Sequence, residues 1–258
     1  MVAPLKTDSN NLEPALNDKK DIKKWLCVDL PVTEYREAWD LQHKLVSARK
    51  DQIIDTNVVL FLEHPPVFTL GRRGGLDNLT VSEGFLEKTG ISVIHVERGG
   101  DITYHGPGQL VVYPIIDLRD SGLRVLDYVT ALEEVMIRAA KDWGVVAERN
   151  PMNRGVWIAN KKLGSIGITV RRGVSFHGIA FNVNVSLDPF EWINPCGLKG
   201  ISMTSMEHEL SHQLSMHEMR EAVKRHMETV FGVGLDVIEI SELKELAAQM
   251  NLDLSFKK

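Results

Sequence analysis

The sequence predicts an α+β fold, in which helices are separated by runs of hairpin-like strands within one domain. Two patterns favour this fold over a doubly wound parallel sheet. Long segments repeat apolar residues every three or four positions, as amphipathic helices do. Between them, short β-rich runs follow one another with only turn residues separating them, as in antiparallel hairpins. No repeat or linker divides the chain, so we expect a single domain over residues 25–258.

The first half of the chain is expected to begin with a helix and to continue with strands. Residues 57–71 (NVVLFLEHPPVFTLG) read as two short apolar strands on either side of a proline pair. Residues 72–90 are rich in turn residues. A strand within 91–100, a glycine-rich loop and a strand within 108–118 are expected next. The helix is expected over residues 34–50, where one face carries Ala38, Leu41, Leu45 and Ala48.

The second half contains the strongest helical pattern and then a group of strands. The helix is expected between Leu123 and Trp143, where apolar residues recur at three- and four-residue steps. Two further helices are expected at residues 216–230 and 241–250. Between the first helix and these two, alternating apolar residues and turn signals predict three strands, RGVWIA (154–159), KLGSIGITV (162–170) and VSFHGIAFNVNV (174–185).

Composition excludes several classes of protein and of site. The net charge of −5 does not indicate a nucleic-acid-binding surface. Two cysteines are too few for a disulfide framework or a four-thiolate zinc site, which favours a reducing compartment. The nine histidines lack metal-ligand spacing such as HExxH, so no metal is expected. No apolar run reaches the roughly 18 to 20 residues that cross a bilayer.

The N-terminal segment differs in composition from the rest. Residues 1–24 are polar, contain proline and asparagine, and lack the apolar centre of a secretory signal. Their acidic residues also argue against an organellar transit peptide. We therefore expect a disordered tail at residues 1–24 and a cytoplasmic protein.

The segment RGGDITYHGPGQ (98–109) is the first candidate for a binding site. Its glycines let backbone amides approach a ligand, and its polar residues supply donors, although a tight β-turn connection would have similar composition. It is neither a GxGxxG nor a Walker sequence, so the usual nucleotide arguments do not apply. Two histidines are ambiguous. His105 lies in the loop, and His177 lies in a strand, where a histidine on an apolar face is usually a satisfied core residue.

A cysteine in a turn is the second candidate. Cys27 lies in the apolar run WLCVDLP and is expected to be an inert core thiol, whereas Cys196 lies between a proline and a glycine in INPCGLKG. A thiol is mostly protonated at neutral pH, so a nucleophilic Cys196 needs a nearby cation or base. Lys162 and His105 are the candidate suppliers. Of the pair Lys161 and Lys162, at most one can face such a site, because adjacent strand residues point to opposite faces.

Taken together, three segments resemble the lipoyl(octanoyl) transferases. They are RGGDITYHGPGQLVVYPIIDL, NKKLGSIGITVRRGVSFHGIAFNVN and INPCGL, in this order, and the similarity covers about residues 26–235. The resemblance implies a single catalytic acyltransferase domain with the class II synthetase-like fold of biotin and lipoate protein ligases, a mixed sheet flanked by helices. It implies no cofactor, no membrane, no nucleic acid and a monomer.

The resemblance also implies a reaction and its partners. An octanoyl group would pass from octanoyl-acyl carrier protein to the ε-amine of a lysine on a lipoyl domain, through a cysteine thioester. The acceptors would be the lipoyl domains of 2-oxoacid dehydrogenase E2 subunits and the glycine cleavage H protein. This is the first step of endogenous protein lipoylation.

Residue by residue, the acyl-thioester cysteine of the family falls on Cys196 and its lysine on Lys162 rather than Lys161. As an ammonium, Lys162 would stabilise the thiolate, and as a free amine it could accept the proton of the incoming lysine. Nearby glycine amides could supply an oxyanion hole. The expected substrate-binding residues are Arg98, Gly99, Gly100, Asp101, Ile102, Thr103, Tyr104, His105, Ser165, Ile166, Gly167, His177, Gly178, Ile179 and Ala180.

Three alternatives remain open at this point. An ATP-dependent lipoate or biotin ligase of the same fold activates a free acid as an adenylate and needs no nucleophilic cysteine. An amidotransferase that moves octanoyl between carrier domains could share the cysteine, and its preferred donor would distinguish it. A non-catalytic module that only holds an acylated carrier would need neither Cys196 nor Lys162.

Overall fold

The computed structural model describes residues 22–151, 153–194, 201–250 and 252–254. Of the predicted tail, residues 1–21 lie outside this set, and the first strand begins at Lys24. Cys196 also lies outside the described residues. Across the part of the chain that the structure describes, no helix combines the length and apolar character needed to cross a bilayer.

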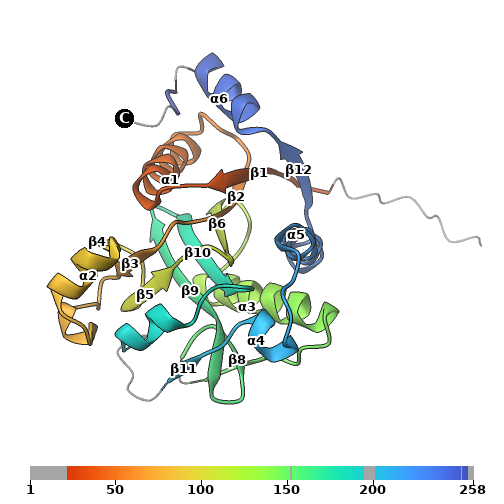
Figure 1. The fold of residues 1–258 in the computed structure, drawn as a ribbon. Coiled ribbons are helices and arrows are strands. Elements are labelled where there is room, and N and C mark those ends of the chain that lie inside the picture. The colour runs from red at the N-terminus through yellow and green to blue at the C-terminus, as the bar shows by residue number, and fades with distance from the viewer. Residues whose placement is uncertain (1–21, 152, 195–200, 251, 255–258) are drawn as a thin grey trace, which may run out of the picture.

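A mixed β-sheet forms the centre of the molecule (Figure 1). Its described strands are β1 (Lys24–Val32), β2 (Val58–Glu63), β6 (Gln109–Asp117), β7 (Glu148–Arg149), β8 (Val156–Ile158), β9 (Lys161–Arg171), β10 (Val174–Asn182), β11 (Ser202–Met203) and β12 (Gly234–Ile238). The order is β12-β1-β2-β6-β10-β9-β8-β7, and β11 pairs with β9. The pairs of β1 with β12 and β2 are parallel, and those from β2 through β7 are antiparallel. The predicted mixed α+β architecture is confirmed.

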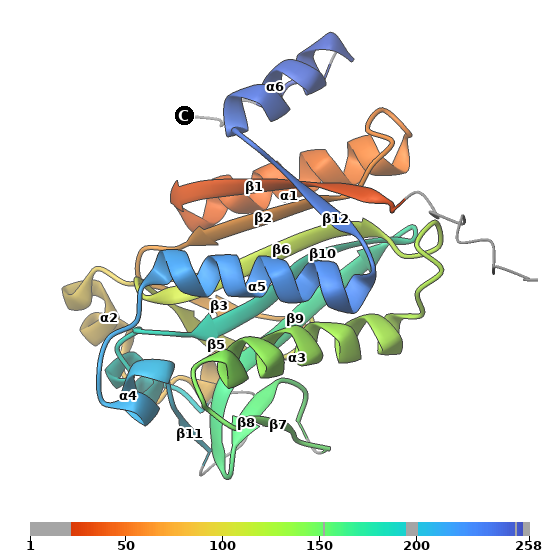
Figure 2. The ribbon, with the colours of Figure 1, turned by 90° about the vertical axis from the view of Figure 1, so that its right-hand side faces the viewer.

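Helices cover both faces of this sheet (Figure 2). Helices α3 (Val125–Asp142) and α5 (Met216–Phe231) pack side by side on one face, and α1 (Tyr35–Lys50) and α6 (Ile240–Gln249) lie on the other. Strand β2 shows the alternation that this requires. Val59 and Phe61 join the core under α3 and α5, whereas Leu60 and Leu62 join the core under α1. Cys27 is buried in the first core, as expected for a structural thiol.

A second, three-stranded sheet packs beside the large one and carries part of the candidate site. It consists of β3 (Val67–Leu70) between β4 (Ser92–His95) and β5 (Ile102–His105). The turn-rich segment 72–90 contains a 3-10 turn, η1 (Leu76–Asn78), and a short helix, α2 (Glu83–Thr89), that we did not predict. Capping explains α2, because the Ser82 side chain accepts from the Phe85 amide and Gly90 ends the helix at φ +72°.

Five other elements were also not predicted. They are a 3-10 turn, η2 (Asp188–Trp192), a one-turn helix, α4 (Met206–Leu210), and the strands β7, β11 and β12. Part of the expected glycine-rich loop is strand β5, which pairs with β3. Each of these elements is short, so hydrophobic periodicity has too few turns or pleats to register it.

Strand β10 is locally irregular at the position that faces the candidate site. His177 adopts φ +56°, the left-handed region, in the middle of the strand. On the neighbouring strand β6, Pro114 has no amide to donate, and β6 makes no paired register with residues 176–178. The His177 amide donates instead to Oε1 of Gln42 on α1, 2.7 Å away. Gly178 fits here only without a side chain, since a Cβ would lie 2.0 Å from the Val112 carbonyl oxygen.

Candidate functional site

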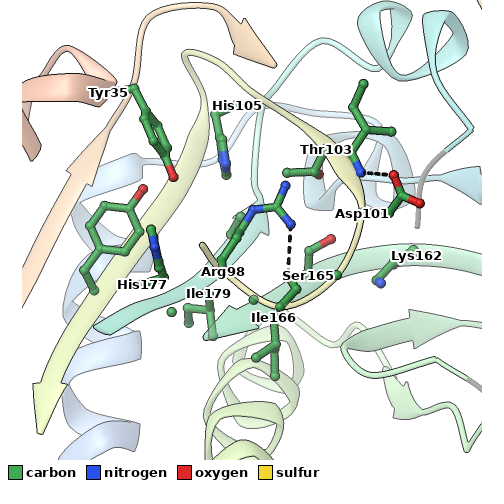
Figure 3. A pocket seen from close by; sticks show the side chains of 17 residues that line it. Tyr35, Arg98, Asp101, Thr103, His105, Lys162, Ser165, Ile166, His177 and Ile179 are labelled. Carbon is green, nitrogen blue, oxygen red and sulfur yellow. Dashed lines mark hydrogen bonds between the residues drawn. The ribbon is translucent and has the colours of Figure 1, made fainter. Parts of the chain in front are cut away.

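A cavity lies where the small sheet and its glycine-rich loop cover strands β9 and β10, beside the start of α1 (Figure 3). It holds about 510 Å³ of space that no protein atom fills, part of it open to solvent. The lining residues are Tyr35, Arg98, Gly99, Gly100, Asp101, Ile102, Thr103, His105, Tyr113, Lys162, Ser165, Ile166, Gly167, His177, Gly178, Ile179 and Ala180.

The glycine-rich loop lies directly on strand β9. The Gly99 amide donates to the Ile168 carbonyl at 3.0 Å, and the Thr169 hydroxyl donates to the Glu97 carbonyl at 2.7 Å. A Cβ at Gly167 would lie 2.9 Å from Cδ of Arg98, so only glycine permits this close approach. The loop therefore forms one wall of the cavity and β9 forms the other.

Arg98 and Asp101 shape this loop. The Arg98 guanidinium donates to the Thr69 carbonyl at 2.7 Å and to the Thr69 hydroxyl at 2.8 Å, which ties the loop to strand β3. The Asp101 carboxylate accepts from the Ile102 amide at 2.6 Å and from the Asn78 side chain at 2.8 Å. Both charged side chains are thus held by the protein itself, and the loop is preorganised before any ligand binds.

Lys162 lies at one end of the cavity, and its ammonium group is held in place (Figure 3). Its side chain is only 2% exposed. The Nζ atom donates to Oδ1 of Asn153 at 2.6 Å and lies 5.3 Å from the centre of the Trp157 ring. A Cβ at Gly155 would lie 2.8 Å from Cε of Lys162, so this glycine leaves room for the lysine stem.

Lys161 points elsewhere. It forms an ion pair with Glu209 at the start of the C-terminal helical region and is not part of the cavity lining. The alternation of side chains along a strand explains this difference, because Lys161 and Lys162 are neighbours in β9 and must face opposite sides of it. The structure therefore separates the two lysines as expected and places Lys162 among the predicted substrate-binding residues.

The opposite end of the cavity contains a directed chain of hydrogen bonds. His64 Nδ1 lies 2.6 Å from the Thr33 carbonyl oxygen, which can only accept, so Nδ1 carries the proton. Burial lowers the pKa of His64 to about 4, which keeps its ring neutral. Its Nε2 therefore accepts from the Tyr113 hydroxyl at 2.8 Å. Tyr35 lines the same end of the cavity as Tyr113.

These two tyrosines are both fixed and protonated at neutral pH. Burial raises the pKa of Tyr35 to about 12 and that of Tyr113 well above its usual value of 10. His105 stacks on Tyr35 and is also neutral, because burial lowers its pKa well below 6.5. Its Nδ1 donates to Oε1 of Gln109 at 2.7 Å.

His177 differs from His64 and His105 in its hydrogen bonding. Its side chain is 1% exposed and lines the cavity. Neither ring nitrogen has a hydrogen-bond partner within the described part of the chain. The nearest carboxylate oxygen, of Glu97, lies 3.7 Å from Nε2, beyond hydrogen-bond distance. Burial lowers the pKa of His177, so the ring is uncharged at neutral pH.

The structure brings together almost all of the residues that the sequence singled out. Every expected substrate-binding residue except Tyr104 lines the cavity with Lys162. Tyr104 packs against Phe68 and Phe190 in the core of the small sheet instead, because β5 turns alternate side chains away from the cavity. Sequence reasoning missed Tyr35 and Tyr113. Tyr113 lies within the segment that carries the family resemblance, whereas Tyr35 had no signal beyond its place at the start of a helix.

The flanks of the cysteine segment border the cavity, although Cys196 itself lies outside the described residues. On the N-terminal side, the Asn194 amide donates to the Asn78 carbonyl at 2.7 Å. On the C-terminal side, strand β11 pairs with β9, with Met203 beside Lys162. Ser202 is six positions from residue 196, a span of at most about 20 Å for an extended chain.

Comparison with known proteins identifies the family. Residues 34–228 match the model described as the lipoyl protein ligase A/B catalytic domain. The chain belongs to this family. Among relatives with curated names, an octanoyltransferase of Desulfotalea psychrophila is 48% identical over 80% of this chain and 93% of its own length. An octanoyltransferase of Syntrophobacter fumaroxidans is 45% identical over 81% of this chain and 92% of its own.

Solved structures show that this member of the lipoyl protein ligase A/B family has the fold of lipoate protein ligases. A putative lipoate protein ligase of Thermoplasma acidophilum superposes with a TM-score of 0.69 at 16% identity, covering 88% of this chain and 93% of that one. A lipoate-protein ligase A bound with ATP superposes with a TM-score of 0.65 at 15% identity, covering 92% and 97%. The predicted lipoate-ligase-like fold is confirmed.

Proposed function

We propose that this protein is an octanoyltransferase of protein lipoylation. It moves an octanoyl group from a thioester donor, octanoyl-acyl carrier protein, to the ε-amine of a lysine on a lipoyl domain. The identity of 48% to a named octanoyltransferase over most of both chains supports this activity. A buried lysine at one end of a narrow cavity is the structural feature that supports it most directly.

The shape and lining of the cavity suit the alkyl chain of an octanoyl group. Ser165–Gly167 on β9 and Gly178–Ala180 on β10 form a floor of small and aliphatic residues, paired in antiparallel register. Gly167 lets Arg98 of the glycine-rich loop approach this floor, and Gly178 lets β10 lie close against β6. Burial of each methylene along such a floor contributes about 0.8 kcal/mol, which is ample to hold a chain of eight carbons.

The reaction consists of two exchanges at one acyl carbon. In the first, the thiolate of Cys196 attacks the donor thioester, the donor thiol leaves, and an octanoyl thioester forms on Cys196. In the second, the lipoyl-domain lysine attacks this thioester, an amide forms, and Cys196 is released as a thiol. As an ammonium, Lys162 stabilises the thiolate in the first exchange and then gives its proton to the departing donor thiol. As the resulting free amine, it takes the proton of the incoming amine in the second exchange and returns it to the sulfur of Cys196.

Intact-mass measurement tests this mechanism. We expect incubation with octanoyl-acyl carrier protein to add one octanoyl group to the wild-type chain, and hydroxylamine to remove it. The Cys196→Ala variant should carry no adduct, and an unchanged adduct would place the acyl group on another residue. Lys162→Ala should slow transfer to a lipoyl domain by at least a hundredfold, whereas Lys161→Ala should be mild.

The same assay separates the alternatives. Transfer without ATP argues against an adenylate-forming ligase, and the higher sequence identity to octanoyltransferases favours the transferase. An amidotransferase would prefer an octanoylated H protein as donor over octanoyl-acyl carrier protein. A non-catalytic module would bind an acylated carrier and leave the acyl group on it.

A further inference from the structure

The end of the cavity far from Lys162 is polar, although the proposed cargo ends in a methyl group. Tyr35 and His177 lie at this end, opposite Lys162 (Figure 3), and Tyr113 adds a second hydroxyl. His177 has two ring nitrogens with no hydrogen-bond partner among the described residues. A site built only to hold a hydrocarbon would place apolar side chains here.

This polar end lies at a defined distance along the sheet. His177 is paired with Ile168, six residues from Lys162 on β9. At about 3.3 Å per residue the backbone positions are roughly 20 Å apart, and the side chains at the two ends occupy part of that length. With carbon–carbon bonds of about 1.5 Å, an extended octanoyl chain spans on the order of 9 Å. A chain of twelve carbons is about 5 Å longer, so it extends further toward the polar groups.

We propose that Tyr35, Tyr113 and His177 set the length of acyl chain that the cavity accepts. This inference rests on the proposed function, and it concerns chain selection rather than the chemistry at Lys162. A chain of eight carbons leaves the polar atoms open to other hydrogen-bonding partners. A chain of twelve carbons covers them with hydrocarbon, and the cost of leaving several buried polar groups without partners offsets what the added methylenes contribute.

The backbone holds these groups in place. The left-handed conformation of His177 is supported by the Gln42 side chain on α1 and by the gap in pairing opposite Pro114. The Tyr35 ring packs against the rings of His64 and His105, and the Tyr113 hydroxyl is held by Nε2 of His64. The polar end is thus a rigid boundary, because neither side chain can turn away without losing a buried contact.

The test compares octanoyl and dodecanoyl chains on wild type and variants of the full chain. Donors are the two acyl-carrier-protein thioesters, and transfer to a lipoyl domain is followed by intact mass. Tyr35→Phe and His177→Leu should each raise the ratio of dodecanoyl to octanoyl kcat/KM at least tenfold. His177→Asn, which keeps polarity and tolerates a positive φ, should stay near the wild-type ratio. Tyr128→Phe, which removes a buried hydroxyl outside the cavity, is the matched control and should not change it.

A second readout does not require turnover. Calorimetric titration with octanoate and dodecanoate should show the same change in relative affinity. This binding measurement tests the inference even if wild type transfers no octanoyl group. Absence of transfer by wild type would refute only the proposed function. Leucine at a positive φ can impair folding, and the isosteric Tyr35→Phe variant covers that case. Unchanged ratios in Tyr35→Phe, by both transfer and binding, would overturn the inference while octanoyl transfer by wild type left the proposed function standing.

Discussion

Neighbouring residues of identical type receive different surroundings in this protein. Lys161 and Lys162 are adjacent in β9, yet one forms an ion pair with Glu209 and the other is buried against Asn153 and Trp157. The alternation of strand residues predicts that only one of them enters the cavity, but it does not say which. The family resemblance selects Lys162, and the structure places that lysine at the cavity.

Asn153 was not predicted as a site residue, although it holds the ammonium group of Lys162. Replacing it by alanine removes the acceptor 2.6 Å from Nζ and weakens the orientation of the lysine end. We expect Asn153→Ala to lower kcat/KM for octanoyl transfer about tenfold, equivalent to about 1.4 kcal/mol of transition-state stabilisation. Steady-state kinetics with octanoyl-acyl carrier protein measures this effect.

The matched control is Glu209→Gln, which removes the charged partner of Lys161 instead. We expect it to stay within about twofold of wild type. Equal losses of kcat/KM in the two variants would mean that the Asn153 effect is a general loss of structure. Thermal unfolding of both variants would then show lowered stability.

Among the elements, the long helices could be predicted, whereas several short elements could not. The helices at 34–50 and 123–143 match α1 and α3 because each repeats its apolar stripe over several turns. Helix α2 and strands β11 and β12 are short, and they depend on caps and on pairing with distant strands. Such tertiary pairing has no local signal in the sequence.

Helix α5 begins at a cap that can be tested alone. The Ser215 hydroxyl accepts from the Glu218 amide at 3.2 Å, which satisfies one of the free donors at the start of the helix. We expect Ser215→Ala to lower the free energy of unfolding by about 1 kcal/mol. Urea denaturation measures it, and Ser215→Asp should retain most of the stability. Equal losses in both variants would show that the hydroxyl is not acting as a cap.

At the scale of the whole molecule, stability should depend on pH because several histidines are buried and neutral. Burial lowers the pKa of His64 from 6.5 to about 4, so the unfolded chain binds this proton more tightly than the folded one. The contribution is present in full above pH 6.5 and is lost as the pH falls toward 4. His105 and His177 shift in the same direction. We expect His64 alone to lower the free energy of unfolding by about 2 kcal/mol between pH 7.5 and pH 5.

Urea denaturation across that pH range tests the expectation. The His64→Gln variant cannot titrate here, and its loss of stability on acidification should be smaller than that of wild type by about the His64 contribution. Parallel curves for the two proteins would assign the pH dependence to other groups.

The sequence therefore predicts the architecture and most of the cavity wall, but not how the ends of the cavity are built. The floor at Ser165–Gly167 and Gly178–Ala180 lies in one strand pair that has its own apolar pattern. Tyr35 reaches the cavity from helix α1, which is remote from these strands in the sequence, and Asn153 holds Lys162 from the loop before β8. Only tertiary packing brings such residues together, and hydrophobic periodicity in the sequence does not predict these contacts.

Strand β12 pairs with β1, although more than 200 positions separate them in the chain. During synthesis, β1 leaves the ribosome early and has only β2 as a neighbour until residues 234–238 follow. One edge of a nascent parallel sheet therefore stays open for nearly the entire period of translation, and open edges invite pairing with other chains. The charged pair formed by Lys24 and Asp236 closes that edge at the last step, so a nascent chain that stalls before β12 should be the form most in need of a chaperone.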